Sequence, residues 1–189
     1  MKKNIRAVII IIVIAAVIGL PLVSSYNNLV SLDQKVKAAE SNIGTLLERR
    51  SSLIPNLVET VKGYAAQEKG IITELANART KLIGSASLTE KANADTELSG
   101  ALSRLLVIVE KYPDLKSNEN FRDLTVSLEG TENRIAIARQ DYNKAVDSYN
   151  SSVRKFPSSI TASLFRFEEK AYYKPSLNAK ELPKVEFTK

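Results

Sequence analysis

The sequence predicts an all-α protein: an antiparallel four-helix bundle that follows an N-terminal transmembrane helix and precedes a mostly irregular C-terminal tail. Three observations support this. An uncharged apolar run opens the chain, apolar residues then recur in alternating steps of three and four, and no stretch alternates as a half-buried strand does. The predicted parts are a short cytoplasmic N-terminus (1–6), a transmembrane helix (7–25), a helical bundle (26–156) and a tail (157–189).

The first element is the apolar run over residues 7–23, which follows Lys2, Lys3 and Arg6. A helix satisfies its own backbone hydrogen bonds in lipid, so such a run crosses a membrane as a helix. Positive charge stays on the cytoplasmic side, which places the bulk of the chain outside the cell membrane. A cleaved signal peptide is the alternative. We expect a retained single-pass anchor, because the run exceeds a signal core of about 7–15 residues and the helical pattern resumes at Tyr26.

Two helical patterns follow the anchor. The second of them continues to Ile83, with Gly84 as a plausible stop. The apolar positions are Leu29, Leu32, Val36, Ala39, Ile43 and Leu46 in the first pattern, and Leu57, Val61, Tyr64, Ile71, Leu75, Ala78 and Leu82 in the second.

Pro55 decides how these two patterns join. Inside a helix, proline loses a hydrogen bond and clashes with the preceding turn, at a cost of about 3 kcal/mol. Three residues after Ser52, as the N-cap of a new helix, its missing N–H is harmless. We therefore expect two helices, with a single kinked helix as the alternative. Arg49 and Arg50 then lie at the end of the first helix, where the dipole and the free carbonyls favour cations.

The third and fourth bundle helices have clear boundaries. Ser87 and Glu90 have the spacing of a capping box, and Pro113 should end the third helix after Tyr112. The fourth helix, over residues 118–156, is the longest, and Gly130 is its one weak point. Its apolar positions are Phe121, Leu124, Leu128, Ile135, Ala138, Tyr142, Ala145 and Tyr149.

The tail holds three prolines, so it cannot form another long helix. Residues 156–189 nevertheless hold six of the chain's twelve aromatic residues, and a solvated linker would be poor in them. We expect Leu164, Phe165 and Phe167 to fold back on the bundle. Docking to a partner or to the lipid surface is the alternative.

Composition excludes several functions. Three of the 27 basic residues precede the apolar run, which leaves 24 against 21 acidic residues, so we expect no nucleic-acid partner. The chain has no His and no Cys. It therefore lacks the commonest general base, the commonest zinc ligands and any thiolate nucleophile. We expect no catalytic residues, no cofactor and no metal site.

Several segments share one pattern: residues 26–30, 49–58, 61–64, 110–116 and 131–136, with Arg139, Tyr142 and Asn143. Together they resemble the LemA family. The resemblance implies a bacterial or archaeal membrane protein with a short N-terminal region, one span and an outward-facing helical bundle, and it implies no known catalytic residues. One departure is visible: many members read Tyr-Ala-x-His-Glu where this chain has Gln67 before Glu68, and a Gln there fits a structural role.

A set of polar residues is the best sequence candidate for a site. An arginine held by an acid across two helices would fix the bundle register without binding anything, and we favour this structural reading. The functional alternative is that Arg134 and Arg139 offer their guanidinium groups to an acidic group on a partner. The full set is Glu68, Glu110, Asn133, Arg134, Arg139 and Asn143.

The function these observations favour is a membrane-anchored, non-enzymatic module that binds another envelope protein or organises the membrane surface. A ligand-sensing bundle with a polar pocket around Arg134 and Arg139 is the first alternative. An enzyme that uses only carboxylates and hydroxyls, with Glu68 or Glu110 essential, is the second.

Overall fold

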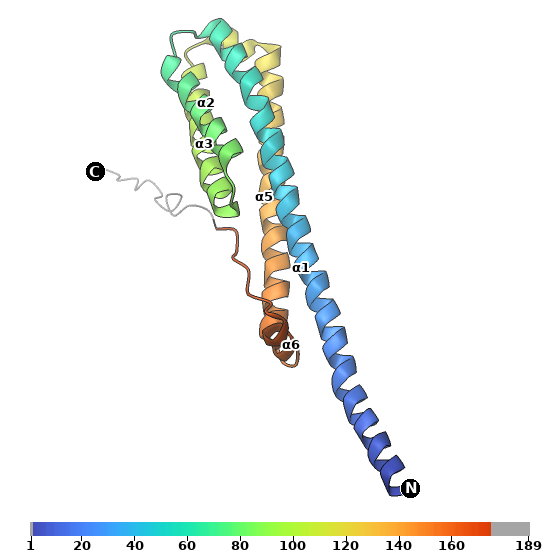
Figure 1. The fold of residues 1–189 in the computed structure, drawn as a ribbon. Helices are drawn as coiled ribbons and strands as arrows, with labels where there is room; N and C mark the ends of the chain where they lie inside the picture. The colour runs from blue at the N-terminus through green and yellow to red at the C-terminus, as the bar shows by residue number, and fades with distance from the viewer. Residues whose placement is uncertain (1, 175–189) are drawn as a thin grey trace, which may run out of the picture. The chain divides into compact units, whose positions relative to one another are not determined.

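The structure is a computed structural model, which describes residues 2–174 and the side chains of residue 17 and of residues 19–174. The described part contains α-helices and no β-strand, which confirms the all-α class for those residues (Figure 1). The helices are α1 (Lys2–Tyr64), α2 (Lys69–Gly84), α3 (Leu88–Val109), α4 (Pro113–Ser117), α5 (Glu119–Arg154) and α6 (Ser158–Phe165).

These residues form two compact units. Within the described part, unit 1 holds residues 2–40 and 141–172, and unit 2 holds residues 41–140 and 173–174. The helices α1 and α5 therefore contribute a segment to each unit.

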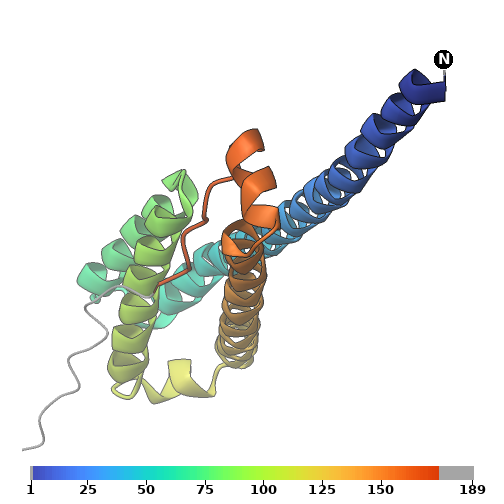
Figure 2. The same cartoon turned by 90° about the horizontal axis from the view of Figure 1, so that it is seen from below.

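Within the described part, unit 2 holds segments of α1 and α5 together with α2, α3 and the short α4, and its long segments run antiparallel to their neighbours (Figures 1 and 2). Its interior is mostly apolar, as the seam pattern predicts, because each helix hides one stripe of side chains against the others. The fully buried large side chains of this unit are Ile43, Ile54, Leu57, Val61, Leu75, Leu98, Leu105, Leu115 and Ile135.

Unit 1 pairs the N-terminal segment of α1 with the C-terminal segment of α5, and α6 lies at the end of α5 (Figure 1). Leu29 and Val36 of α1 are fully buried, as are Val146 and Tyr149 of α5. The side-chain amide of Asn28 donates to the hydroxyl of Ser152 across the two helices, at 3.3 Å.

The helix break predicted before Pro55 is wrong. α1 continues through Pro55 to Tyr64, so the alternative of a single helix holds. Pro55 is exposed, whereas Ile54 and Leu57 on either side of it are buried. Burying a large apolar side chain is worth about 1.5–3 kcal/mol, so the core on both sides of the proline offsets its cost.

The capping box at the start of α3 is confirmed, since Ser87 and Glu90 bond each other's backbone N–H groups. Two other boundaries differ from the prediction. α3 ends at Val109 rather than at Tyr112, and Pro113 begins α4, a place where its missing N–H is tolerated. α5 begins at Glu119, with the side chain of Asn118 accepting from Phe121 N–H at 3.0 Å.

The predicted anchor and the predicted tail are only partly described. The backbone of residues 7–25 belongs to α1, and the side chains of residues 7–16 and 18 lie outside the described part. No described helix combines the length and the apolar character that a membrane span requires. The tail includes α6 and is otherwise irregular as far as residue 174; residues 175–189 lie outside the described part.

Candidate functional site

The most unusual feature of unit 2 is a cluster of four charged side chains, of which Arg50 and Asp95 are buried and Glu132 and Arg139 are half-buried. Arg50 of α1 contacts Asp95 of α3, with Nη1 and Oδ1 2.5 Å apart. Arg139 of α5 pairs with the other carboxylate oxygen of Asp95. Glu132 of α5 completes the cluster, with Oε2 2.5 Å from Nη1 of Arg50 and Oε1 3.8 Å from Nη1 of Arg139.

Burial of charged groups in this cluster carries a desolvation cost. The side chain of Asp95 is fully buried and that of Arg50 is 4% exposed. An ion removed from water is tolerated only when its charge and its hydrogen-bonding groups find partners. Here two cations face two carboxylates, so the cluster is neutral as a whole. It ties α1, α3 and α5 together at one level of the unit.

Tyr173 covers the charge cluster. Its ring lies over the guanidinium of Arg139, with 5.1 Å between the guanidinium carbon and the ring centroid, a cation–π arrangement. Burial raises the pKa of the Tyr173 phenol, against the opposing effect of Arg139. Tyr173 thereby brings this part of the tail against the charge cluster.

A cavity of about 260 Å³ adjoins the charge cluster. Arg50 and Glu132 line one part of it, and apolar side chains of α1, α3 and α5 line most of the rest. Such a cavity suits an apolar group better than a charged one. The main apolar lining residues are Leu57, Leu102, Leu105, Leu106, Phe121 and Leu128.

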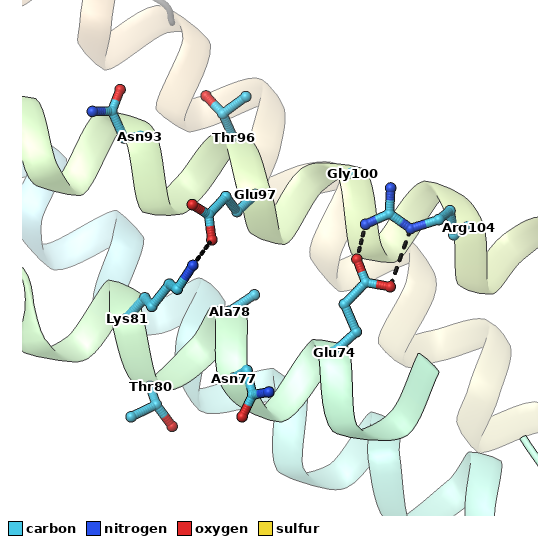
Figure 3. A pocket seen from close by; sticks show the side chains of 10 residues that line it. All are labelled: Glu74, Asn77, Ala78, Thr80, Lys81, Asn93, Thr96, Glu97, Gly100 and Arg104. Atoms are coloured by element: carbon cyan, nitrogen blue, oxygen red, sulfur yellow. Dashed lines mark hydrogen bonds and ion pairs between the residues drawn. The ribbon is translucent and has the colours of Figure 1, made fainter. Parts of the chain in front are cut away.

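A second hollow is the open groove between α2 and α3, with a volume of about 1020 Å³ (Figure 3). Two ion pairs cross it: Lys81 Nζ lies 2.6 Å from Glu97 Oε2, and Glu74 pairs with Arg104. The rest of the lining is mostly small or neutral polar: Asn77, Ala78, Thr80, Asn93, Thr96 and Gly100.

The predicted polar set is dispersed in the structure. Glu110 is exposed and pairs with Lys116 at 2.6 Å, and it does not hold an arginine across two helices. Asn133 and Arg134 are exposed on α5, and Asn143 is half-buried in unit 1. Of the six residues, only Arg139 joins the charge cluster.

Glu68, another member of that set, takes part in a surface network at the start of α2. It accepts from the phenol of Tyr112 at 2.9 Å, and Gln67 donates to the same phenol oxygen at 2.9 Å. The hydrogen bond to Glu68 raises the pKa of Tyr112. Both polar side chains thus fasten the start of α2 to the residue that precedes α4.

Sequence reasoning missed Asp95 and Glu132 and misplaced Arg50. With no turn before Pro55, Arg50 lies inside α1 rather than at a helix end. A signal was present, since Arg50 is seven residues after Ile43 and Asp95 is three before Leu98, each on an apolar seam. Charged residues at seam positions indicate a buried ion pair.

The chemistry open to the charge cluster is limited. Both carboxylates are engaged by arginines, which remain protonated in proteins and cannot act as general acids at neutral pH. Among the described residues no group of three or more metal-ligating side chains comes together. The arrangement therefore favours a structural task.

Fold and cluster together define an all-α helical module braced by internal ion pairs. The sequence profile of the LemA family matches residues 39–187, and the chain belongs to this family. Magnetosome protein MamQ 2 of Paramagnetospirillum magneticum is 29% identical over 91% of this chain and 73% of its own length. Magnetosome protein MamQ of Magnetospirillum gryphiswaldense is 26% identical over 80% and 65%. Protein LemA of Metamycoplasma hominis is 23% identical over 69% and 60%. None of these names denotes an enzyme.

Proposed function

We propose that this protein is a membrane-anchored, non-enzymatic module that binds another protein of the cell envelope at the outer face of the cytoplasmic membrane. One observation carries the proposal: the charges of the cluster pair with one another within unit 2, whereas the α2–α3 groove places two ion pairs, Lys81–Glu97 and Glu74–Arg104, on an open surface (Figure 3). An open, polar surface with paired charges is more typical of the rim of a protein interface than of a pocket that encloses a substrate.

The anchoring part of the proposal comes from the sequence. Lys2, Lys3 and Arg6 precede the apolar run, and the positive-inside rule then places unit 2 outside the cytoplasm. The relatives named as magnetosome proteins support an association with a cellular structure rather than a freely diffusing enzyme.

Site-specific crosslinking in the native host tests the binding surface. The full chain carries a photocrosslinking amino acid at Asn77, which is exposed in the groove, or at Asp123, which is exposed on α5. We expect one recurring adduct of defined mass from position 77 and none from position 123. The absence of an adduct from both positions, together with a lone monomer in every detergent-solubilised preparation, would overturn the proposal.

Protease accessibility tests the orientation separately. Protease added to intact spheroplasts should digest the helical units that follow the anchor. Full protection there, with digestion only from the cytoplasmic face, would reverse the proposed topology.

The cavity beside Arg50 favours a second candidate, a module that senses an apolar small molecule. Its volume of about 260 Å³ falls slightly below the usual range for ligand pockets, about 300–1,000 Å³. Ligand binding to the native state raises the melting temperature. A library of small hydrophobic compounds that leaves the melting temperature unchanged would count against this candidate.

A further inference from the structure

We propose that α6 lies in the headgroup region of the membrane and inserts its exposed apolar side chains among the lipids, which gives the chain a second membrane contact beside the N-terminal helix. The inference rests on the proposed anchoring. Four large apolar side chains carry it: Phe156, which precedes α6, and Ile160, Leu164 and Phe165 of α6 itself. We call these four residues the α6 patch.

α6 has one face packed against the rest of unit 1 and another in solvent. Thr161 and Ala162 are buried, whereas Leu164 is 66% exposed and Phe156 is 81% exposed. Ile160 and Leu164 are four residues apart and therefore lie on the same side of the helix. Large apolar side chains left exposed on and beside one short helix mark an interaction site with another apolar phase.

The position of the α6 patch identifies that phase as lipid. Tyr26 directly follows the predicted span at 7–25, and its ring lies 4.8 Å from the ring of Phe165 and 5.7 Å from that of Phe167. A helix rises about 1.5 Å per residue, so Tyr26 sits within a few ångströms of the end of the span. Aromatic rings gather at this depth, where an apolar body meets a hydrated boundary.

Charges around α6 agree with this placement. Lys155 and Arg166 flank the helix and are exposed, so they can reach lipid phosphates while their stems stay in the apolar layer. Glu168 and Glu169 follow, and Glu169 Oε1 lies 3.8 Å from Arg154 Nε. The basic flanks favour a surface with anionic lipid, although the acidic pair weakens this attraction.

Bonds within unit 1 hold α6 in place independently of lipid. Lys170 Nζ lies 2.8 Å from Asp33 Oδ1 of α1. The side chain of Asn150 on α5 accepts from the backbone N–H of Lys170 at 2.8 Å and donates to its carbonyl at 2.9 Å. Burial by itself favours a higher pKa of the Asp33 carboxyl. Its hydrogen bonds and charge interactions with Lys170 and Lys37 together outweigh burial, so the pKa lies below its usual value. The segment after α6 is therefore fastened to both long helices, which fixes the level of the α6 patch relative to Tyr26.

Single-tryptophan fluorescence tests the inference, because the chain contains no Trp. The full chain is reconstituted in phosphatidylcholine vesicles that contain a minority of phosphatidylglycerol and lipids with a nitroxide near the headgroup. Leu164→Trp probes the α6 patch, and Val126→Trp in unit 2 is the matched control, since Leu164 and Val126 are both 66% exposed. Val17→Trp, with a nitroxide deep in the acyl chain, reports whether the anchor is inserted.

We expect the Leu164→Trp emission to shift to the blue and to lose intensity through shallow quenching, with no change for Val126→Trp. Deep quenching of Val17→Trp without shallow quenching at position 164 would overturn the inference and leave the anchor intact. No quenching of Val17→Trp or of Leu164→Trp would overturn both the inference and the proposed anchoring. A blue shift at position 164 without quenching would show that another protein surface covers the α6 patch. Equal quenching at positions 126 and 164 would show nonspecific adsorption. Either result would overturn the inference. If Leu164→Trp loses the native circular dichroism spectrum, Ile160→Trp probes the same patch.

Discussion

Arg50 of α1 and Asp95 of α3 form an ion pair with 2.5 Å between Nη1 and Oδ1; the two residues are 45 positions apart in sequence, and both side chains are almost wholly shielded from water. Each residue is tolerated in the interior because its charge is paired, with Glu132 as a second partner of Arg50 and Arg139 as a second partner of Asp95. Removing one partner of a buried pair leaves an uncompensated charge, which costs far more than the pair contributes when intact. The pair therefore fixes α1 against α3 even though it adds little net stability.

Asp95→Asn should destabilise the protein strongly. The variant leaves Arg50 and Arg139 with Glu132 as their only acidic partner within the charge cluster. We expect the free energy of unfolding to fall by about 3–5 kcal/mol, as measured by urea denaturation of the full chain in detergent. Glu110→Gln is the control, because its pair with Lys116 is exposed and is worth about 0–1 kcal/mol. Equal losses in the two variants would contradict the structural role assigned to the charge cluster.

The fold class was predictable because apolar periodicity continues along nearly the whole chain. The charge cluster was not predictable from the sequence. Arg50 and Asp95 stand on apolar seams, but a seam position does not reveal which acid on another helix faces which arginine. That pairing depends on the relative register of three helices, which no local pattern encodes. Reading Arg50 as a helix-end cation followed from the wrong break before Pro55.

Ser87→Ala should destabilise α3 at its first turn. The Ser87 hydroxyl accepts from Glu90 N–H at 3.2 Å, and loss of such a cap costs about 1 kcal/mol. Urea denaturation measures the change. Ser103→Ala is the matched control in the same helix, because its exposed hydroxyl only bonds the carbonyl of Ser99 and alanine favours helix. A loss at position 103 as large as that at position 87 would argue against the capping role.

Alkaline pH should destabilise unit 1 through Tyr149. Burial, with the negative charge of Asp33 second, raises the pKa of its phenol. The folded state thus resists ionisation, whereas the unfolded chain ionises near pH 10. The stabilising contribution is complete below about pH 10 and is lost as the pH rises through the folded pKa. Tyr149→Phe should flatten the decline of unfolding free energy above pH 10, and parallel curves for variant and parent would contradict this.

The prolines show where sequence rules need packing to decide between them. Pro55 and Pro113 both carry the same local signal against a helix interior. The buried core on both sides of Pro55 keeps α1 continuous, whereas Pro113 has no such helix to interrupt and instead opens α4. A local rule predicts the free-energy cost of a proline in a helix. Only the tertiary contacts show whether packing offsets that cost.

Arg166 supplies the last prediction, because it ends α6 in the left-handed region at φ 58° and ψ 43°. A side chain in this conformation brings Cβ close to the following carbonyl, at a cost of roughly 1–2 kcal/mol that glycine escapes. Glycine loses more backbone entropy on folding, by about 0.5–1 kcal/mol, which offsets part of that gain. We expect Arg166→Gly to be more stable than Arg166→Ala by up to about 1 kcal/mol in urea denaturation. The comparison isolates the backbone, since both variants remove the guanidinium. Equal or greater stability of the alanine variant would show that the end of α6 does not require the left-handed conformation.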